Sequence, residues 1–198
     1  MNQASSKNAT SRCGIIVTND DEIASRARLL RTHGIASDYD ENGDLDYLYD
    51  VVDMGYKFDI SELEAAFNIA QLKKTNHFIG RRVDIANIYT QRLSGLKHVK
   101  IPMFCEDQIY TQFIVEIGKN RDAFARALKD EGISTGLHYV PLHLLTYYKN
   151  KYKLKIMAYP NALNSYGKIL SLPIYAAMTD EDVNYVCDKI IEIESQWV

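Results

Sequence analysis

The sequence predicts an α/β fold, because short strand-like apolar runs alternate with helices that carry recognisable capping residues. The alternation is clearest after residue 105, where strand, helix, strand and helix follow one another through short connections. This order predicts a small α/β sandwich over residues 105–198. Residues 1–104 form the other predicted region, which ends in two consecutive helices.

Composition limits the possible classes of function. The 198 residues are 46% hydrophobic and 25% charged, which is ordinary for a globular domain with its own core. The formal net charge of −3 gives no electrostatic argument for binding nucleic acid or an anionic membrane. No apolar run is long enough to span a bilayer, and the first residues lack the apolar core of a signal peptide, so we expect a cytoplasmic protein. The widely spaced Cys13, Cys105 and Cys187 indicate neither a metal site nor a disulfide framework.

The first region begins with a predicted strand and helix. Residues 14–18 predict a short buried strand, followed by a helix with Asn19 or Asp20 as its N-cap and Gly34 as the C′ residue that ends it. The acidic, tyrosine-containing segment 37–53 is expected to be a surface loop. A substrate lid and a plain loop are both open interpretations of this segment.

The stretch from residue 55 to residue 74 contains a loop that leads into a capped helix. Ser61 is a good N-cap, and Glu64, three residues later, completes a capping box. One apolar face of this helix is predicted to consist of Leu63, Ala66, Phe67 and Ala70. The preceding loop contains Lys57 and Asp59, and a polar loop at a helix N-terminus is a natural place for anion contacts. The plain alternative is that the helix is only scaffold.

The remaining elements follow from apolar periodicity and caps. A helix is expected from about residue 77 to residue 93, with Arg81 and Arg82 pointing away from its apolar stripe. Alternating apolar residues predict a strand over 110–117, and Asn120 caps the next predicted helix, which ends at Gly132. Further predicted elements are a strand over 133–139, helices over 144–148 and 161–170, and a last helix capped by Thr179 and Asp182.

Three ordered motifs carry a resemblance to a known family. They are GYKFDISELEAA at 55–66 with QLKK at 71–74, GISTGLHYVPLH at 132–143, and SLPIY at 171–175. These motifs resemble the DegT/DnrJ/StrS family of aminotransferases, which use pyridoxal phosphate (PLP) and act on nucleotide-linked keto-sugars. The match extends over nearly the whole chain but covers only the C-terminal half of the family's length. It implies the C-terminal portion of a PLP fold-type I aminotransferase, in which residues 1–104 are the end of the large cofactor-binding domain with its connecting helices and residues 105–198 the small domain.

The resemblance also assigns site residues. Lys7, in the segment KNATS, matches the lysine to which the family attaches PLP, although Arg12 and Cys13 follow where the family has Glu-Gly. Lys57 matches a residue that contacts the cofactor phosphate of the neighbouring subunit. Two further matches, His138 and Tyr139, are expected to contact substrate, and no metal ligands are expected.

The function implied by the resemblance is transfer of an amino group from glutamate to a nucleotide-linked keto-sugar, for polysaccharide or glycan biosynthesis, by a homodimer. In the family, the loop that binds the cofactor phosphate and the acid that pairs with the ring nitrogen precede the lysine. Only six residues precede Lys7. The competing hypothesis is therefore a catalytically incomplete remnant that serves as an assembly or sugar-binding piece.

Overall fold

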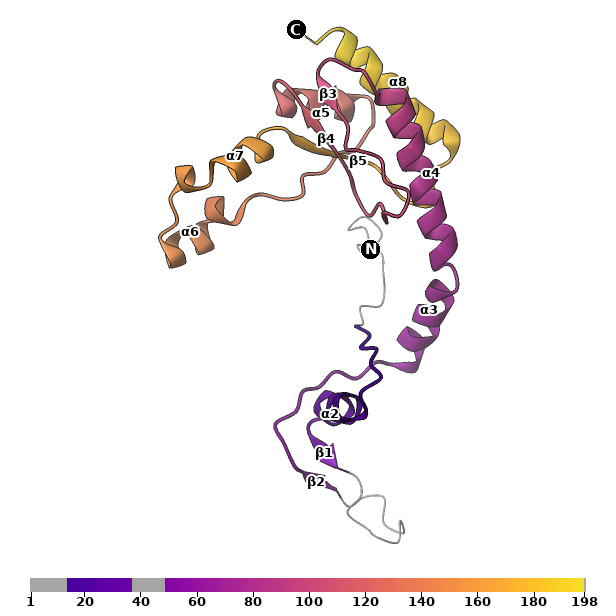
Figure 1. Ribbon diagram of the computed structural model, residues 1–198, viewed down its shortest axis with the longest axis vertical. Coiled ribbons are helices and arrows are strands. Elements are labelled where there is room, and N and C mark those ends of the chain that lie inside the picture. Colours follow the sequence, from indigo (N-terminus) through magenta and orange to yellow (C-terminus); the bar gives the residue numbers. More distant parts are fainter. Residues whose placement is uncertain (1–13, 37–48, 198) are drawn as a thin grey trace. The chain divides into compact units, whose positions relative to one another are not determined.

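The computed structural model describes residues 14–36 and 49–197, and these belong to two compact units that meet in sequence at Lys73 and Lys74 (Figure 1). We call them the N-terminal unit and the C-terminal unit. The boundary expected near residue 105 refers to the domains of the longer family fold and stays a prediction.

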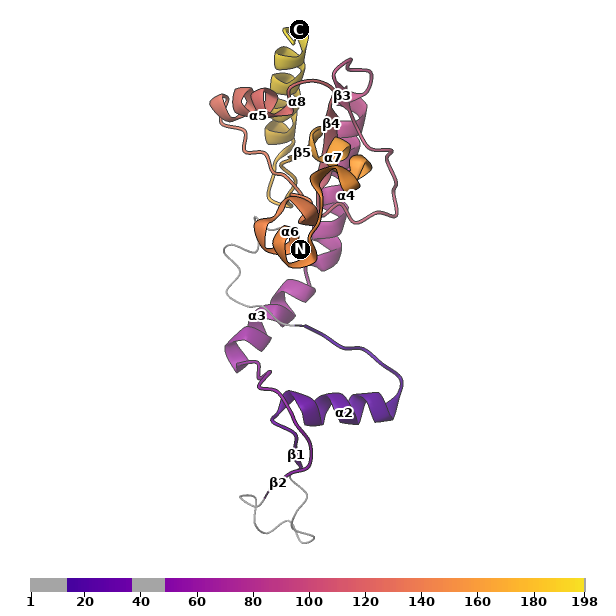
Figure 2. The same ribbon diagram turned by 90° about the vertical axis from the view of Figure 1, so that its left-hand side faces the viewer.

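The N-terminal unit consists of α2 (Asp21–Arg31), a two-stranded antiparallel ladder of β1 (Ile35–Ala36) and β2 (Asp50–Val51), and α3 (Glu62–Leu72) (Figure 2). Asp20 caps α2 as expected, because its side chain accepts hydrogen bonds from the backbone of the first turn. The expected end of this helix was wrong by one residue. Thr32 is the C-cap, and His33 at C′ adopts φ 58°.

Apolar side chains that were expected to be buried in this unit are exposed. Residues 14–18 form no strand, contrary to the prediction, and Val17 is 89% exposed. Helix α3 and its capping box form as expected, yet none of its residues is fully buried. The local pattern therefore predicted the helix correctly, whereas burial also requires a covering surface that the described residues do not supply.

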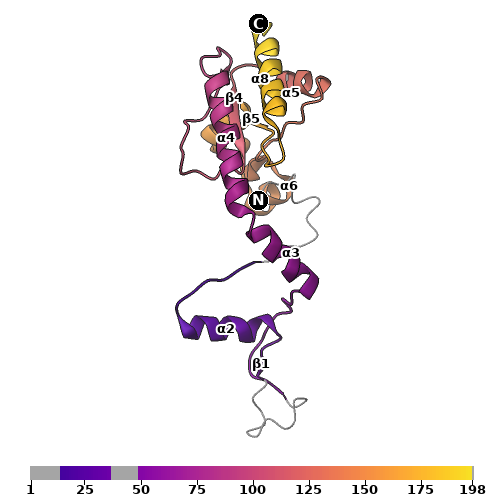
Figure 3. The ribbon, with the colours of Figure 1, turned by 90° about the vertical axis from the view of Figure 1, so that its right-hand side faces the viewer.

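The C-terminal unit is built on a three-stranded antiparallel sheet with the order β3 (Val99–Lys100), β4 (Phe113–Ile117), β5 (Ile169–Leu172). Helices α4 (Thr75–Leu93), α5 (Arg121–Asp130) and α8 (Asp180–Ser195) share one hydrophobic core with this sheet, and α4 lies beside α8 (Figure 3). This arrangement agrees with the small α/β sandwich expected for the end of the chain.

Aromatic residues fill the centre of this core. The fully buried Tyr89 contacts Phe113 with ring centroids 5.1 Å apart and donates a hydrogen bond to the Pro173 carbonyl at 2.8 Å. Burial raises the pKa of Tyr89 well above its ordinary value. The rings of Trp197 and Phe124 pack in a T-shaped arrangement with centroids 5.2 Å apart.

Two local expectations in this unit were wrong. Residues 133–139 form no regular strand, and Gly136 only makes an isolated bridge to Ser171. The expected helix 161–170 is α7 (Pro160–Tyr166), and the residues after it form β5 because they pair with β4. Between α5 and β5 the chain also forms η1 (Leu142–Leu144), α6 (Thr146–Tyr152) and η2 (Ile156–Ala158).

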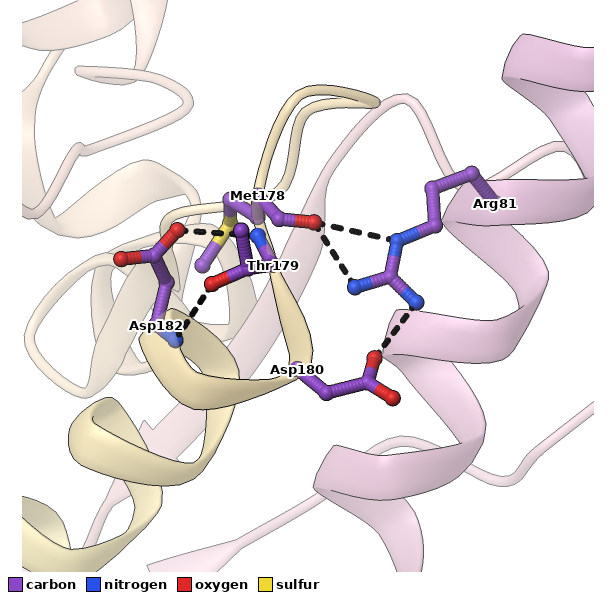
Figure 4. Close-up of polar contacts among 5 residues, drawn as sticks. All are labelled: Arg81, Met178, Thr179, Asp180 and Asp182. Carbon is purple, nitrogen blue, oxygen red and sulfur yellow. Dashed lines mark hydrogen bonds and ion pairs between the residues drawn. The ribbon is translucent and has the colours of Figure 1, made fainter.

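Arg81 and Arg82 on α4 do not point away from the fold as expected. The Arg81 guanidinium donates two hydrogen bonds to the Met178 carbonyl, at 3.1 and 2.7 Å, and pairs with Asp180 at 2.7 Å (Figure 4). Arg82 donates to two other carbonyls, those of Tyr110 and Ile174, at 3.1 and 2.9 Å. The two arginines therefore fasten α4 to the segments that lead into β4 and α8.

Candidate functional site

The predicted site residues lie in different parts of the chain. Lys57 lies in the N-terminal unit, whereas His138 and Tyr139 are neighbours in the C-terminal unit. Lys7 lies outside the described residues. Within one unit the histidine and the tyrosine lie together, and the loop of Lys57 belongs to the other unit.

Backbone hydrogen bonds fix the loop that carries Lys57 to the end of α2. The Tyr56 carbonyl accepts from the N–H of His33 at 2.8 Å, and the Tyr56 and Phe58 N–H groups donate to carbonyls of α2 at 2.7 and 2.9 Å. Two glycines make this approach possible, because a Cβ on Gly55 would lie 2.0 Å from the backbone nitrogen of Gly34.

The Lys57 side chain is 73% exposed, and its Nζ lies 2.8 Å from Oδ2 of Asp59. This hydrogen bond, with the accompanying charge attraction, raises the pKa of Lys57 and lowers the pKa of Asp59. The contact favours the charged form of Lys57, and an anion that binds there must compete with Asp59.

The N-terminus of α3 is already occupied by the chain's own groups. Ser61 Oγ accepts from the Glu64 N–H at 3.3 Å, and Glu64 Oε2 accepts from the Ser61 N–H at 3.0 Å, which lowers the pKa of Glu64. A phosphate at this loop would thus fit the Lys57 ammonium rather than the capped helix N-terminus, where a carboxylate already lies. The residues present fit a cofactor phosphate through this one side chain.

The His138 imidazole is held from one side by Ser171. Its Nδ1 lies 2.8 Å from Ser171 Oγ, and Ser171 is only 5% exposed. The backbones of Ser171 and Gly136 exchange two hydrogen bonds, and a Cβ on Gly136 would lie 2.9 Å from His138 Cε1. Among the described residues the ring makes no other hydrogen bond, so Nε2 is the ring nitrogen left for a ligand.

Tyr139 extends this site with an exposed aromatic ring. The ring meets the His138 imidazole edge-on, with centroids 4.9 Å apart. An imidazole nitrogen beside an aromatic face and a phenol hydroxyl can bind the hydroxyls and apolar face of a sugar. The pair can therefore bind and orient a polar ring-shaped ligand.

Neither described hollow of the C-terminal unit coincides with these residues. The larger, about 550 Å³, lies between residues 132–134 and the first turns of α8, and neither His138 nor Tyr139 lines it. Over residues 14–36 and 49–197, no group of three or more His, Cys, Asp or Glu side chains is arranged to hold a metal ion. In the same residues, no helix combines the length and apolar character needed to cross a bilayer.

The contact of Ser171 with His138 was not predicted from the sequence. Ser171 was recognised within the SLPIY motif, but the helix expected over residues 161–170 left no place for β5. The available signal was the apolar run that precedes Pro173, which is typical of a buried strand.

Comparison with known proteins identifies the chain's relatives. The model of the DegT/DnrJ/EryC1/StrS aminotransferase family matches residues 4–191. The chain is 32% identical over 198 residues to the uncharacterized protein MJ1066 of Methanocaldococcus jannaschii, covering 94% of this chain and 51% of that protein. It is also 32% identical over 197 residues to the spore coat polysaccharide biosynthesis protein SpsC of Bacillus subtilis, covering 93% of this chain and 50% of SpsC. The chain thus spans about half the length of the curated relatives it matches.

A solved structure supports the fold. The putative sugar aminotransferase Spr1654 of Streptococcus pneumoniae, in its PMP-form, superposes with a TM-score of 0.82 at 24% identity, covering 93% of this chain and 48% of that one. Spr1654 has also been solved in its apo- and PLP-forms. The expected fold class, the C-terminal portion of a PLP fold-type I aminotransferase, is confirmed. Because the family model matches residues 4–191 of the 198, the chain belongs to the DegT/DnrJ/EryC1/StrS aminotransferase family.

Proposed function

We propose that the protein is a PLP-dependent aminotransferase that transfers the amino group of glutamate to the keto carbon of a nucleotide-linked sugar, in the cytoplasm, for polysaccharide or glycan biosynthesis. The observation that carries this proposal is the family match over residues 4–191. The family relationship supports PLP as the cofactor, which when bound supplies an electron sink for the carbon that exchanges its amino group.

In this proposal Lys7 holds the cofactor and moves a proton at its Nζ, and therefore must be neutral when it acts. Lys57 contacts the cofactor phosphate of a neighbouring subunit, which requires a homodimer. The exposure and positive charge of Lys57 support this role, and the nearby Asp59 weakens it.

His138 and Tyr139 would contact the sugar in the same scheme. The hydrogen bond between Ser171 Oγ and His138 Nδ1 supports a fixed imidazole that presents Nε2 to a hydroxyl or a diphosphate oxygen. The exposed ring of Tyr139 supports contact with a sugar face.

The test of cofactor attachment is absorbance after PLP is added to the purified chain, followed by borohydride reduction and mass mapping. We expect a band above roughly 400 nm, typical of lysine-bound PLP, with the reduced label on Lys7. The Lys7→Arg variant should lose both the band and the label. A label spread over surface lysines in both proteins would refute the assignment of Lys7.

The test of Lys57 is a pair of substitutions with opposite expected signs. Lys57→Gln should weaken PLP binding by roughly tenfold, because a charged contact to the phosphate is lost. Asp59→Asn should strengthen binding, because the competing carboxylate is removed. Lys73→Gln, at another exposed lysine, is the matched control. Equal affinities in all four proteins would exclude Lys57 from the phosphate site.

The remnant hypothesis is supported by a different observation, the exposed apolar residues 15–17 and the incompletely buried α3. A piece that serves in assembly needs such a surface. This hypothesis predicts association in analytical ultracentrifugation without specific labelling at Lys7. Specific labelling would instead support the enzyme.

A further inference from the structure

One folded segment of the C-terminal unit contributes no side chain to the hydrophobic core of that unit. Residues 142–166, here called the lysine–tyrosine arm, include η1, α6, η2 and α7 and extend away from the sheet (Figure 1). The core contains Ile133 before the arm and Leu170 after it, but no side chain from the arm itself. His143 is the one buried residue of the arm, and all of the arm is described.

The arm nevertheless exposes a dense group of large apolar and aromatic side chains. Met157, on η2, is the most exposed of them at 73%. The other exposed members are Leu142, Leu145, Tyr147, Tyr148, Tyr152, Ile156 and Tyr159. Such a concentration within one short segment indicates a surface that contacts another phase or molecule.

The charge of the arm has a single sign. Lysines occupy positions 149, 151, 153 and 155, and the sequence contains no Asp or Glu between Glu131 and Asp180. Among the described residues none of these four lysines forms an ion pair with a carboxylate. Lys151 Nζ instead lies beside aromatic side chains, 3.1 Å from the Tyr147 hydroxyl and 5.6 Å from the centre of the Tyr152 ring.

We propose that the lysine–tyrosine arm binds the surface of an anionic lipid bilayer. Lysines are attracted to anionic headgroups, and tyrosines with neighbouring aliphatic side chains favour the boundary between headgroups and acyl chains. A soluble polyanion would use the lysines but would leave Leu142, Ile156 and Met157 in water. The bilayer is therefore the partner that fits both the lysines and the exposed apolar side chains of the arm. The chain's net charge of −3 does not reveal this local cationic segment.

Co-sedimentation of the full chain with vesicles tests the proposal. We expect binding to vesicles of phosphatidylcholine and phosphatidylglycerol, weak binding to phosphatidylcholine alone, and loss of the electrostatic part in high salt. Replacing the four arm lysines by Gln should lower the partition coefficient on the order of a hundredfold. The matched control carries the same change at four exposed lysines elsewhere, Lys73, Lys74, Lys97 and Lys100, and should bind like the unmodified chain.

A second pair of measurements separates the bilayer from other occupants. Replacing Ile156 and Met157 by Gln should also weaken vesicle binding, because the apolar contact is lost while the charge is kept. The proposal would be overturned if the chain bound soluble polyphosphate as tightly as vesicles, through the lysines, and the Ile156 and Met157 changes had no effect on that binding. Equal losses in the control variant, or a dimer that protects the arm from hydrogen exchange and does not bind vesicles, would overturn it too.

Discussion

Substituting Arg81 by Met should destabilise the C-terminal unit far more than substituting its ionic partner. The Arg81 side chain is only 18% exposed and donates two hydrogen bonds to the Met178 carbonyl. Hydrogen bonds that involve a charged group contribute about 1.5–3 kcal/mol, and the abandoned carbonyl would lose its charged donor. The Asp180 side chain is 68% exposed, so the ion pair itself contributes about 1 kcal/mol or less. We therefore expect a loss of about 2–3 kcal/mol for Arg81→Met and about 1 kcal/mol or less for Asp180→Asn.

Urea unfolding followed by tryptophan fluorescence measures these losses. Trp197 is the single tryptophan of the sequence, and its ring packs on Phe124 in the same unit as Arg81. The signal therefore reports on the unit in question, and the shift of the midpoint at constant slope gives the change in unfolding free energy. The reasoning fails if Asp180→Asn costs as much as Arg81→Met, because the ion pair rather than the carbonyl contact would then be the stabilising interaction.

Three further outcomes are expected. The backbone N–H of Thr179 lowers the pKa of Asp182, so Asp182→Asn should remove a stabilising contribution that is present above about pH 4 and lost as the pH falls through the lowered pKa. A difference in unfolding free energy between the two proteins that is the same at every pH would contradict this. Ser171→Ala should shift the His138 ring resonances in nitrogen-15 NMR, because Nδ1 loses its hydrogen-bond partner, whereas Ser171→Thr keeps a hydroxyl and should shift them less; unchanged ring shifts in Ser171→Ala would show that the hydroxyl does not contact the imidazole. Burial raises the pKa of the Cys187 thiol to about 11, so iodoacetamide should modify this residue only after unfolding, and rapid modification of the folded chain would disprove its burial.

Local signals predicted the parts of the fold that depend on residues close in sequence. Both capping boxes, at Ser61 and Thr179, form as expected because each joins a residue to another three positions away. The strand β5 was missed because its pairing partner β4 lies far earlier in the chain. Arg81 and Arg82 were misplaced for the same reason, since helical periodicity cannot reveal carbonyl acceptors in distant segments.

The candidate site shows the same difference between local and long-range signals. The motif resemblance located His138 and Tyr139, but the contact that orients the imidazole exists only because Ser171 on β5 pairs with Gly136. Lys57 was located with its neighbour Asp59, whose competing carboxylate follows from their spacing of two residues. Lys7 stays a prediction, as do the roles in binding assigned to the other three residues.

The attachment of the Lys57 loop has a consequence for how this protein can evolve. The loop is held by main-chain groups of His33, Tyr56 and Phe58, and the Lys57 side chain takes no part in holding it. A different side chain at position 57 would therefore inherit the same backbone position, and with it the same reach toward an anion. Gly34 and Gly55 do not share this freedom, because any side chain at either would collide with the opposing backbone. Ligand preference at this loop can thus change by single substitutions at position 57 while the two glycines remain fixed.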